Sequence, residues 1–334
     1  MKKAFITGIT GQDGAYLSKL LIDKGYKVYG LLRRTVNRSL ENLEYLGIAD
    51  KINYIDGDMT DEASLIKAIK DIQPDEVYNL AAQSFVGSSW LQASATIEIN
   101  AMGTLRLLNA IKNNCPTAKF YQASSSEMFG NNSDNGIQNE LTPFKPRSPY
   151  GISKVTAHML TVNYRESYGL FACCGILFNH ESPIRGIEFV TRKITDGVAK
   201  IKLGLSDHIE LGNLDAERDW GFAGDYVKAM WSMLQRDNPK DYIICTGKSH
   251  SLRNFINEAF KAVGITDWTK YIKTNPKYMR PAELNKLEGD NSLALQELEW
   301  KPKLDFKDLV GLMVKEDIRR IEIKIVSYEN NSSL

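Results

Sequence analysis

The first half of the chain alternates short apolar runs with segments whose apolar residues recur at helical spacing. Residues 4–6 and 27–32 are apolar enough for buried strands. The stretch 15–24 between them has helical periodicity, and it is followed by Gly25, a residue type that favours helix ends. Parallel strands need a crossover between them, so this alternation predicts a parallel sheet with helices on both faces.

The same pattern continues to about residue 180 and then loosens into short helices and Pro-containing loops. We therefore expect an α/β fold with a Rossmann-type doubly wound parallel sheet over residues 1–180, to which some later segments return. A smaller mixed α/β substrate-binding region should span residues 181–325, and a tail should follow at 326–334. Further strands are predicted at 52–55, 76–81, 119–123 and 170–177, and further helices at 65–72, 100–113 and 155–168.

Composition narrows the function classes. Of the 334 residues, 43% are hydrophobic, enough for a sizeable core, and the formal net charge of +1 gives no electrostatic basis for a nucleic-acid or membrane partner. The four cysteines lack the paired CxxC spacing of a zinc site and are too few for a disulfide scaffold. Since no signal peptide or long apolar run is recognisable, we expect a cytoplasmic protein without a bound metal.

The clearest motif is GITGQDG at residues 8–14, between the first predicted strand and the first predicted helix. Glycines let the backbone turn tightly and approach a pyrophosphate, and the helix N-terminus offers it free N–H groups. A glycine-rich turn without a ligand would not need this position at the strand–helix junction. The motif therefore predicts a dinucleotide site, and its spacing resembles that of the short-chain dehydrogenase/reductase superfamily.

The end of the second predicted strand distinguishes NAD from NADP. A carboxylate there would bind the ribose 2′-hydroxyl, whereas this chain has Arg33 and Arg34, whose guanidinium groups suit a 2′-phosphate. We therefore predict NADP. In this superfamily Asp58, after the third strand, is placed to bind the adenine amino group, and the small residues after the fourth strand can pass beside the cofactor.

A second set of residues has the chemistry of proton transfer. Tyr150 and Lys154 are four apart on a predicted helix and so share a face; a lysine cation there should lower the pKa of the phenol. The tyrosine could then accept a hydroxyl proton, with Ser125 holding the same oxygen. Glu127 could remove a proton from a carbon next to a keto group, although a structural carboxylate is the alternative.

Over about residues 3–320 the chain resembles the GDP-mannose 4,6-dehydratases, which belong to the extended short-chain dehydrogenase/reductases. The resemblance implies a hydro-lyase that converts a GDP-sugar to its 4-keto-6-deoxy form. Oxidation at C4 by NADP, abstraction of the C5 proton, loss of the C6 hydroxyl as water and return of hydride to C6 would follow in turn. The motifs that carry the resemblance are TGITGQDG (7–14), SSE (125–127), PRSPY (146–150), ILFNHESP (176–183), FVTRKI (189–194), GNLDAERDWG (212–221) and RPAE (280–283).

The resemblance also implies roles for individual residues. The catalytic set would be Ser125, Glu127, Tyr150 and Lys154. Cofactor contacts would come from Gly8, Ile9, Thr10, Gly11, Gln12, Asp13, Gly14, Arg33, Arg34, Asp58, Met59, Leu80, Ala81, Ala82, Gln83, Ser84, Tyr150, Lys154, His180 and Arg185. Contacts to the GDP-sugar would come from Ser84, Asn179, Lys193, Arg218, Arg280 and Glu283.

Two segments depart from the family pattern. Residues 85–93, which border the sugar, differ in sequence, so another GDP-sugar such as GDP-manno-heptose is an alternative substrate. The loop at residues 33–39 is shorter than the one through which the family assembles tetramers, so we expect a homo-oligomer that is either a dimer or a tetramer. A nucleotide-sugar epimerase or reductase, and a non-catalytic NADP-sensing protein on the same fold, are the remaining alternatives.

Overall fold

A computed structural model describes residues 1–35, 39–131 and 136–331 of the chain. The strands are β1 (Lys3–Thr7), β2 (Lys27–Leu32), β3 (Asn53–Asp56), β4 (Glu76–Asn79), β5 (Lys119–Ser125), β6 (Ala172–Leu177), β7 (Asn179–Glu181), β8 (Ile209–Leu211), β9 (Glu217–Phe222), β10 (Tyr242–Ile244), β11 (Ser249–Ser251), β12 (Ile272–Thr274) and β13 (Lys286–Leu287). The longer helices are α1 (Gln12–Asp23), α3 (Glu62–Ile72), α6 (Gly103–Asn114), α7 (Pro149–Tyr168), α8 (Val190–Lys202), α9 (Ala223–Leu234), α10 (Leu252–Lys261) and α12 (Phe306–Asn331).

Short helical segments join these elements. They are α2 (Glu41–Tyr45), α4 (Val86–Ser89), α5 (Ala93–Ile97), α11 (Ser292–Leu298), the 3₁₀ turns η1 (Ala49–Lys51), η3 (Ser126–Met128), η4 (Thr269–Tyr271) and η5 (Pro276–Tyr278), and the π-helical stretch η2 (Glu98–Met102).

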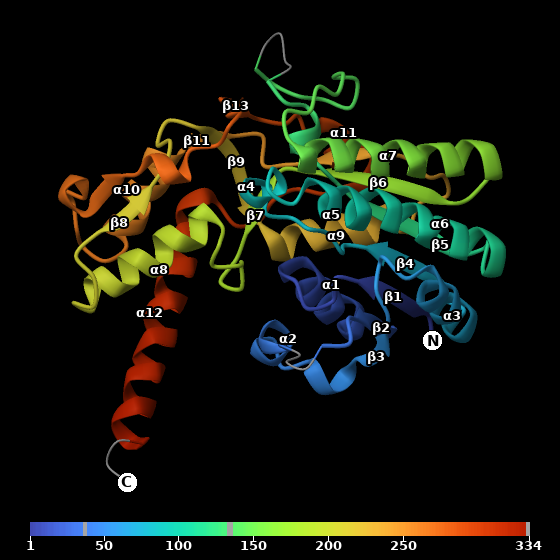
Figure 1. Ribbon diagram of the computed structural model, residues 1–334, viewed down its shortest axis with the longest axis horizontal. Helices are drawn as coiled ribbons and strands as arrows, with labels where there is room; N and C mark the ends of the chain where they lie inside the picture. Colours follow the sequence, from blue (N-terminus) through green and yellow to red (C-terminus); the bar gives the residue numbers. More distant parts are fainter. Residues whose placement is uncertain (36–38, 132–135, 332–334) are drawn as a thin grey trace.

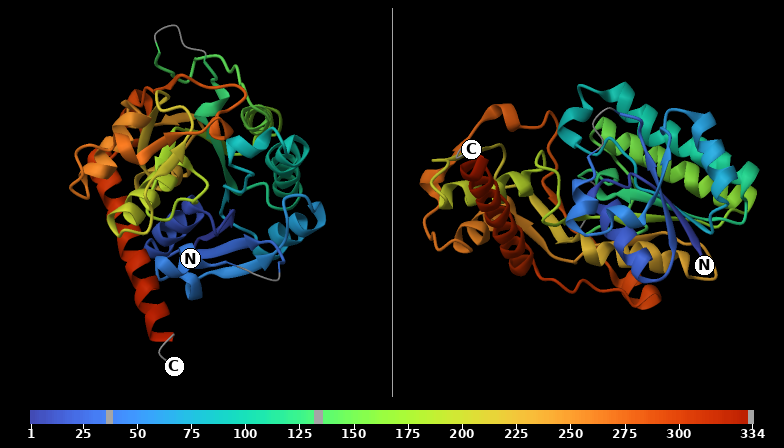
Figure 2. Two further views of the ribbon diagram at one scale, coloured as in Figure 1. Left: turned by 60° about the vertical axis from the view of Figure 1, so that its left-hand side comes forward. Right: turned by 90° about the horizontal axis from the view of Figure 1, so that it is seen from below.

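A parallel sheet forms the centre of the larger part of the molecule, here called the sheet domain. Among the described residues its strand order is β10-β6-β5-β4-β1-β2-β3, and every neighbouring pair runs parallel. Successive residues of a strand face opposite sides, as β1 shows: Ala4 and Ile6 pack with α1 and α9, whereas Phe5 packs with α3 and α6. Both faces of the sheet are thus covered by helices (Figures 1 and 2), which confirms the predicted Rossmann-type α/β class.

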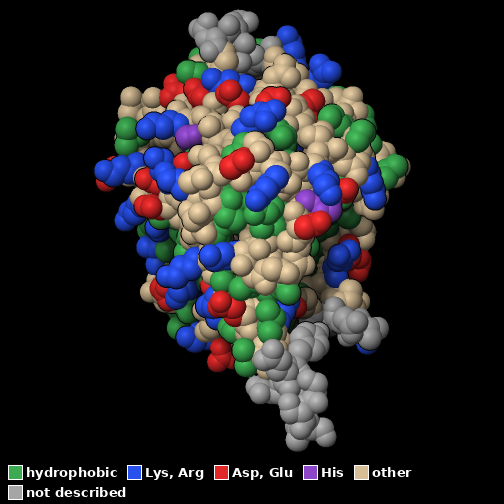
Figure 3. All heavy atoms as spheres, turned by 90° about the vertical axis from the view of Figure 1, so that its left-hand side faces the viewer, with side chains coloured by type: hydrophobic (Ala, Val, Ile, Leu, Met, Phe, Trp, Pro, Cys, Tyr) green, Lys and Arg blue, Asp and Glu red, His purple; other side chains and the backbone are tan. Residues whose placement is uncertain are grey.

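The second, smaller part, here called the cap, is formed mainly by residues after β7. Its core lies between α8, α10 and α12 and includes Trp220, Phe255 and Leu309. Acidic and basic side chains are interspersed on the face of the molecule seen in Figure 3, in keeping with the balanced composition. Within the described chain, each helix falls short of the length or apolarity required to cross a membrane.

Two segments beyond residue 180 return to the sheet domain. Strand β10 pairs with β6 at the sheet edge, and α9 packs against α1 on one face, burying Tyr226 and Met230. The chain thus crosses between the sheet domain and the cap more than once.

Helix α12 continues to Asn331, through most of the segment 326–334 that is predicted as a tail, and it extends away from the body of the molecule (Figure 1). Residues 332–334 lie outside the described residues.

Candidate active site

The glycine-rich loop lies between β1 and α1, as predicted. Gly8 has a φ of +71°, and a Cβ there would come within 2.7 Å of the Ala81 nitrogen. A Cβ on Gly14 would lie 2.3 Å from the Gly8 oxygen. Glycine is therefore required at both positions, and the first backbone N–H groups of α1 are left available at the loop.

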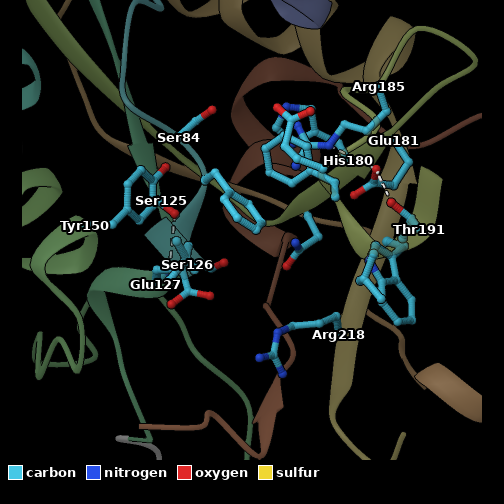
Figure 4. Close-up of a pocket in the computed structure, with 18 of the residues that line it drawn as sticks. Ser84, Ser125, Ser126, Glu127, Tyr150, His180, Glu181, Arg185, Thr191 and Arg218 are labelled. Atoms are coloured by element: carbon cyan, nitrogen blue, oxygen red, sulfur yellow. Dashed lines mark hydrogen bonds and ion pairs between the residues drawn. The ribbon is translucent and has the colours of Figure 1, made fainter. Parts of the chain in front are cut away.

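A cavity of about 700 Å³ opens at this loop and extends between the carboxyl ends of the strands and the cap. This is where doubly wound sheets bind their ligands. Figure 4 shows side chains from both parts of the molecule pointing into it. The predicted site residues that line the cavity are Gly8, Gly11, Gln12, Asp13, Gly14, Leu80, Ala82, Ser84, Ser125, Glu127, Tyr150, Lys154, Asn179, His180, Arg185, Lys193, Arg218, Arg280 and Glu283.

Tyr150 reaches the cavity from the first turn of α7. Ser148 caps this helix by accepting a hydrogen bond from the Gly151 nitrogen at 3.0 Å, and Pro149 begins it. Burial raises the pKa of Tyr150 to about 12, while a hydrogen bond with Ser125, at the end of β5, acts in the opposite direction. Tyr150 and Ser125 therefore meet at one point of the cavity (Figure 4).

Lys154 behaves differently from the sequence-based expectation. Its Nζ donates to the Ala123 carbonyl oxygen at 2.8 Å and lies 5.8 Å from the centre of the Tyr150 ring. Burial lowers the pKa of Lys154 to about 8. The lysine does share a face with Tyr150, but the phenol pKa is raised rather than lowered, because the loss of hydration outweighs the charges around it.

Glu127 lies in the 3₁₀ turn η3, directly after β5. Its backbone N–H donates to the Ser125 side chain at 3.3 Å, and its carboxylate is largely buried at the cavity wall. The Oε1 atom of Glu127 lies 3.2 Å from Nη1 of Arg280, which follows η5 in the cap. The carboxylate is thus held between the sheet domain and a cation of the cap.

Further charges converge on the same end of the cavity. Arg218 in β9 is almost completely buried, and its Nη1 donates to the carbonyl oxygens of Glu217 and Leu284 at 2.8 and 2.9 Å. Its Nη2 lies 3.4 Å from the Glu283 carboxylate. Lys193 on α8 holds its Nζ 3.3 Å from the centre of the Tyr278 ring. Such a group of cations suits a diphosphate.

The end of the cavity at the glycine-rich loop contains a second cluster of charged side chains. His180 Nε2 is 2.8 Å from Asp13 Oδ2, and Gln12 donates to the His180 carbonyl oxygen at 3.0 Å. Arg185 stacks over the ring of Phe189 at 3.5 Å, and its Nε is 3.1 Å from a Glu181 oxygen. These contacts join the phosphate loop to the start of the cap.

The structure places some of the predicted cofactor residues outside the cavity wall. Ile9 and Met59 are core residues, and the Asp58 carboxylate accepts hydrogen bonds from Thr60. Arg33 and Arg34 are exposed at the end of β2. Residues 36–38 of the loop expected to contribute to assembly are not among the described residues. The others outside the wall are Thr10, Ala81 and Gln83.

The sequence-based prediction assigned no role to several residues that shape the site. The Asn100 side chain accepts a hydrogen bond from the Gln83 nitrogen at 2.8 Å and donates one to the Gln83 carbonyl oxygen at 3.1 Å. It also donates to Ser153 Oγ at 2.9 Å. It thereby ties the strand-end loop to the first turns of α7. Phe85 and Phe189 meet edge to face in the cavity wall with ring centres 5.9 Å apart. Residue 85 could have been singled out, because it begins the segment that departs from the family pattern.

A buried group outside this cavity also has metal-ligand chemistry. Ligand atoms of His158, Cys174 and Asp241 lie within 4.8 Å of one another. Asp241 is bound by both terminal nitrogens of Arg165 at 2.8 Å, and His158 Nδ1 is bonded to Ser124 Oγ at 3.0 Å. These pairings give His158 and Asp241 hydrogen-bonding partners within the protein, so we interpret the group as structural.

The comparison with solved structures shows the same fold. The dTDP-glucose 4,6-dehydratase of Bacillus anthracis in complex with NAD aligns with a TM-score of 0.83 at 21% identity, over 96% of this chain and 98% of that one. The RMD protein of Pseudomonas aeruginosa complexed with NADPH aligns with a TM-score of 0.78 at 23% identity, over 96% and 100%.

Sequence relatives are much closer. The chain is 50% identical over 329 residues to GDP-mannose 4,6 dehydratase 2 of Arabidopsis thaliana, covering 95% of this chain and 87% of that protein. It is 46% identical to the GDP-mannose 4,6 dehydratase of Homo sapiens, over 94% and 91% of the two chains. Residues 5–313 match the family described as GDP-mannose 4,6 dehydratase. The chain therefore belongs to the GDP-mannose 4,6-dehydratase family.

Proposed function

We propose that the protein is an NADP-dependent hydro-lyase that converts GDP-mannose to its 4-keto-6-deoxy product and water. One observation carries the proposal: the Glu127 carboxylate lies in the same cavity as the Ser125–Tyr150 pair and is in contact with Arg280. An enzyme that only oxidised the sugar would need the serine and the tyrosine but no carboxylate beside them. A carboxylate beside them adds the base that removal of a C5 proton requires.

The cofactor proposal is supported by the glycine-rich loop, whose shape at the cavity leaves room for a pyrophosphate. Glycines at positions 8 and 14 leave room where a Cβ would collide with backbone, so a pyrophosphate can approach α1 closely. Arg33 and Arg34 would bind the 2′-phosphate that distinguishes NADP from NAD. A bound nicotinamide would supply the hydride acceptor at C4 and the hydride donor at C6.

The chain's own residues would manage the protons. Tyr150 and Ser125 would hold the C4 oxygen, and Tyr150, in its phenolate form, would take the proton of that hydroxyl. Glu127 would then take the C5 proton, the released electron pair would form the C5–C6 double bond, and the C6–O bond would break. Glu127 would pass the proton to the departing hydroxide so that water leaves. When hydride returned to C6, C5 would take up a proton from solvent, which completes the product.

The substrate proposal rests on the charges at the cap end. Arg218, Arg280 and Lys193 offer cations to the diphosphate, and Glu283 offers acceptors to the ribose hydroxyls. Asn179 and Ser84 also line the cavity. By the same family resemblance we propose a homo-oligomer that is either a dimer or a tetramer. We also propose that the protein is cytoplasmic.

A second substrate is favoured by one observation. The aromatic pair Phe85–Phe189 lines the cavity next to Ser84, and residue 85 departs from the family pattern. A different wall at the sugar end would suit a different sugar, so GDP-manno-heptose is the alternative substrate, with the same chemistry at C4, C5 and C6.

The proposal is tested by incubating the purified protein with GDP-mannose and a trace of NADP⁺ and weighing the sugar nucleotide by mass spectrometry. Loss of one water without net formation of NADPH is expected. An unchanged mass with GDP-mannose but loss of water from GDP-manno-heptose would move the proposal to the second substrate. Failure with every GDP-sugar would refute it.

A further inference from the structure

The ion pair between Glu127 and Arg280 joins two groups that have separate tasks in the proposed function. Glu127 belongs to the sheet domain and would act on the sugar, whereas Arg280 belongs to the cap and would bind the diphosphate. Their contact of 3.2 Å spans 153 positions of sequence and crosses the cavity between the two parts. A role for this contact in the reaction rests on the proposed function.

The backbone on each side of the contact is fixed. A Cβ on Gly151 would lie 2.9 Å from the Glu127 carbonyl oxygen, so η3 packs directly on the turn of α7 that presents Tyr150. On the cap side, a Cβ on Gly212 would lie 2.4 Å from the Tyr278 carbonyl oxygen, and the Asn275 nitrogen donates to the Leu211 oxygen at 2.8 Å. The contact between Glu127 and Arg280 is therefore made by side chains that extend from two closely packed segments.

The two arginines of the site differ in how they are held. Arg218 is 7% exposed and bound to backbone carbonyl oxygens, which fixes its guanidinium. Arg280 is 30% exposed, and its Nη1 is bonded to the Glu127 carboxylate. A guanidinium has five N–H donors in a planar fork, so one that bonds to Glu127 still has donors for a phosphate oxygen.

We propose that Arg280 is a positioning residue for the base: its guanidinium binds the substrate diphosphate and the Glu127 carboxylate together, so the diphosphate sets the direction of the carboxylate. The base would then be aimed at C5 only when a nucleotide diphosphate occupies the cap. In the proton transfer itself, Glu127 takes the C5 proton and gives it to the departing C6 hydroxide, and Arg280 neither gains nor loses a proton.

The first test measures binding of GDP alone, by calorimetry, to the wild type, Glu127→Gln, Arg280→Gln and the double variant. If Arg280 links the two groups, the effects of the substitutions on the GDP Kd will be non-additive by at least about threefold. Additive effects would overturn the inference while leaving the proposed function intact. If GDP does not bind the wild type, both proposals fail.

The second test separates positioning from simple substrate binding. At saturating substrate, Arg280→Gln should lower kcat by about 100-fold, because a misdirected base slows elimination, and reduced nicotinamide should accumulate during a single turnover. The control is Lys193→Gln, which removes a cation from the same end of the cavity and should raise KM without that accumulation. A wild-type kcat in Arg280→Gln, with only KM raised, would overturn the inference. Thermal melting of each variant verifies that it is folded.

Discussion

The Nε2 atom of His180 lies 2.8 Å from Oδ2 of Asp13, so a side chain of the phosphate loop pairs with the first residues after the sheet domain. Burial alone would lower the pKa of His180, but the Asp13 carboxylate outweighs it, and the pKa of the imidazole is raised. Burial likewise opposes ionisation of Asp13, yet His180 and Arg185 hold the pKa of that carboxyl below its usual range. The two residues therefore favour each other's charged forms.

This pair predicts a pH-dependent stability. The pKa of His180 is raised above 6.5, so its contribution is fully present below about pH 6.5 and is lost as the pH rises through the folded-state value. The pKa of Asp13 lies below 3.8, so its contribution is present above about pH 3.8 and is lost in stronger acid. Asp13→Asn should therefore cost about 2 kcal/mol near pH 5.5 and less at pH 9. Urea unfolding of both proteins across this range measures it, and a pH-independent difference would contradict it.

Glu127→Gln tests the assignment of the base. The amide keeps the size of the side chain but cannot accept the C5 proton, so turnover should fall by about 10²- to 10⁴-fold while reduced nicotinamide still forms. Rapid-mixing absorbance and mass spectrometry of the nucleotide measure the two steps. The control is Glu283→Gln, which alters another carboxylate of the cavity. It should raise KM, because Glu283 is proposed to bind the ribose hydroxyls. Full dehydration by Glu127→Gln would refute its role.

The sheet domain was predictable because its signals are local. Strand β2 begins and ends where the apolar run 27–32 does, and the glycines of residues 8–14 lie where the spacing placed them. The contact of Glu127 with Arg280 was not predictable, because periodicity carries no information on which cap loop faces which strand end.

Two further features, the strand β10 and the pKa of Tyr150, also depend on long-range packing and could not be predicted from local sequence. Strand β10 is a run of three apolar residues, too short to be recognised without its partner β6. The pKa of Tyr150 depends on how deeply the cavity wall buries it, and the i, i+4 spacing from Lys154 does not encode that burial.

The exposed pair Arg33 and Arg34 predicts the cofactor preference. Replacing both with alanine should weaken binding of NADP by about 10- to 100-fold and leave NAD almost unaffected, because only NADP carries the 2′-phosphate. Fluorescence titration with each nucleotide measures both affinities. Equal losses for NADP and NAD would show that the arginines support the fold or the pyrophosphate instead.

Helix α12 is joined to α8 by a buried ion pair. Arg192 Nε donates to the Asp317 carboxylate at 2.8 and 3.0 Å, Thr195 donates at 2.6 Å, and Asp317 is 1% exposed. Asp317→Ala should destabilise the protein by about 3–5 kcal/mol, because it leaves Arg192 buried without its partner.

The exposed arginine of the pair Arg319–Glu316 on the same helix provides the control, since Arg319→Ala should leave the free energy of unfolding almost unchanged. Denaturant unfolding compares the two variants, and equal losses would contradict the assignment.

The most direct test of 4,6-dehydration is to follow the hydrogen at C4. GDP-mannose deuterated at C4 is incubated with the protein and a trace of NADP⁺, and the product is examined by NMR and mass spectrometry. A 4,6-dehydratase should yield a product one water lighter with deuterium at C6. Deuterium that remains at C4 of an epimer, or is found in NADPH or solvent, would contradict it.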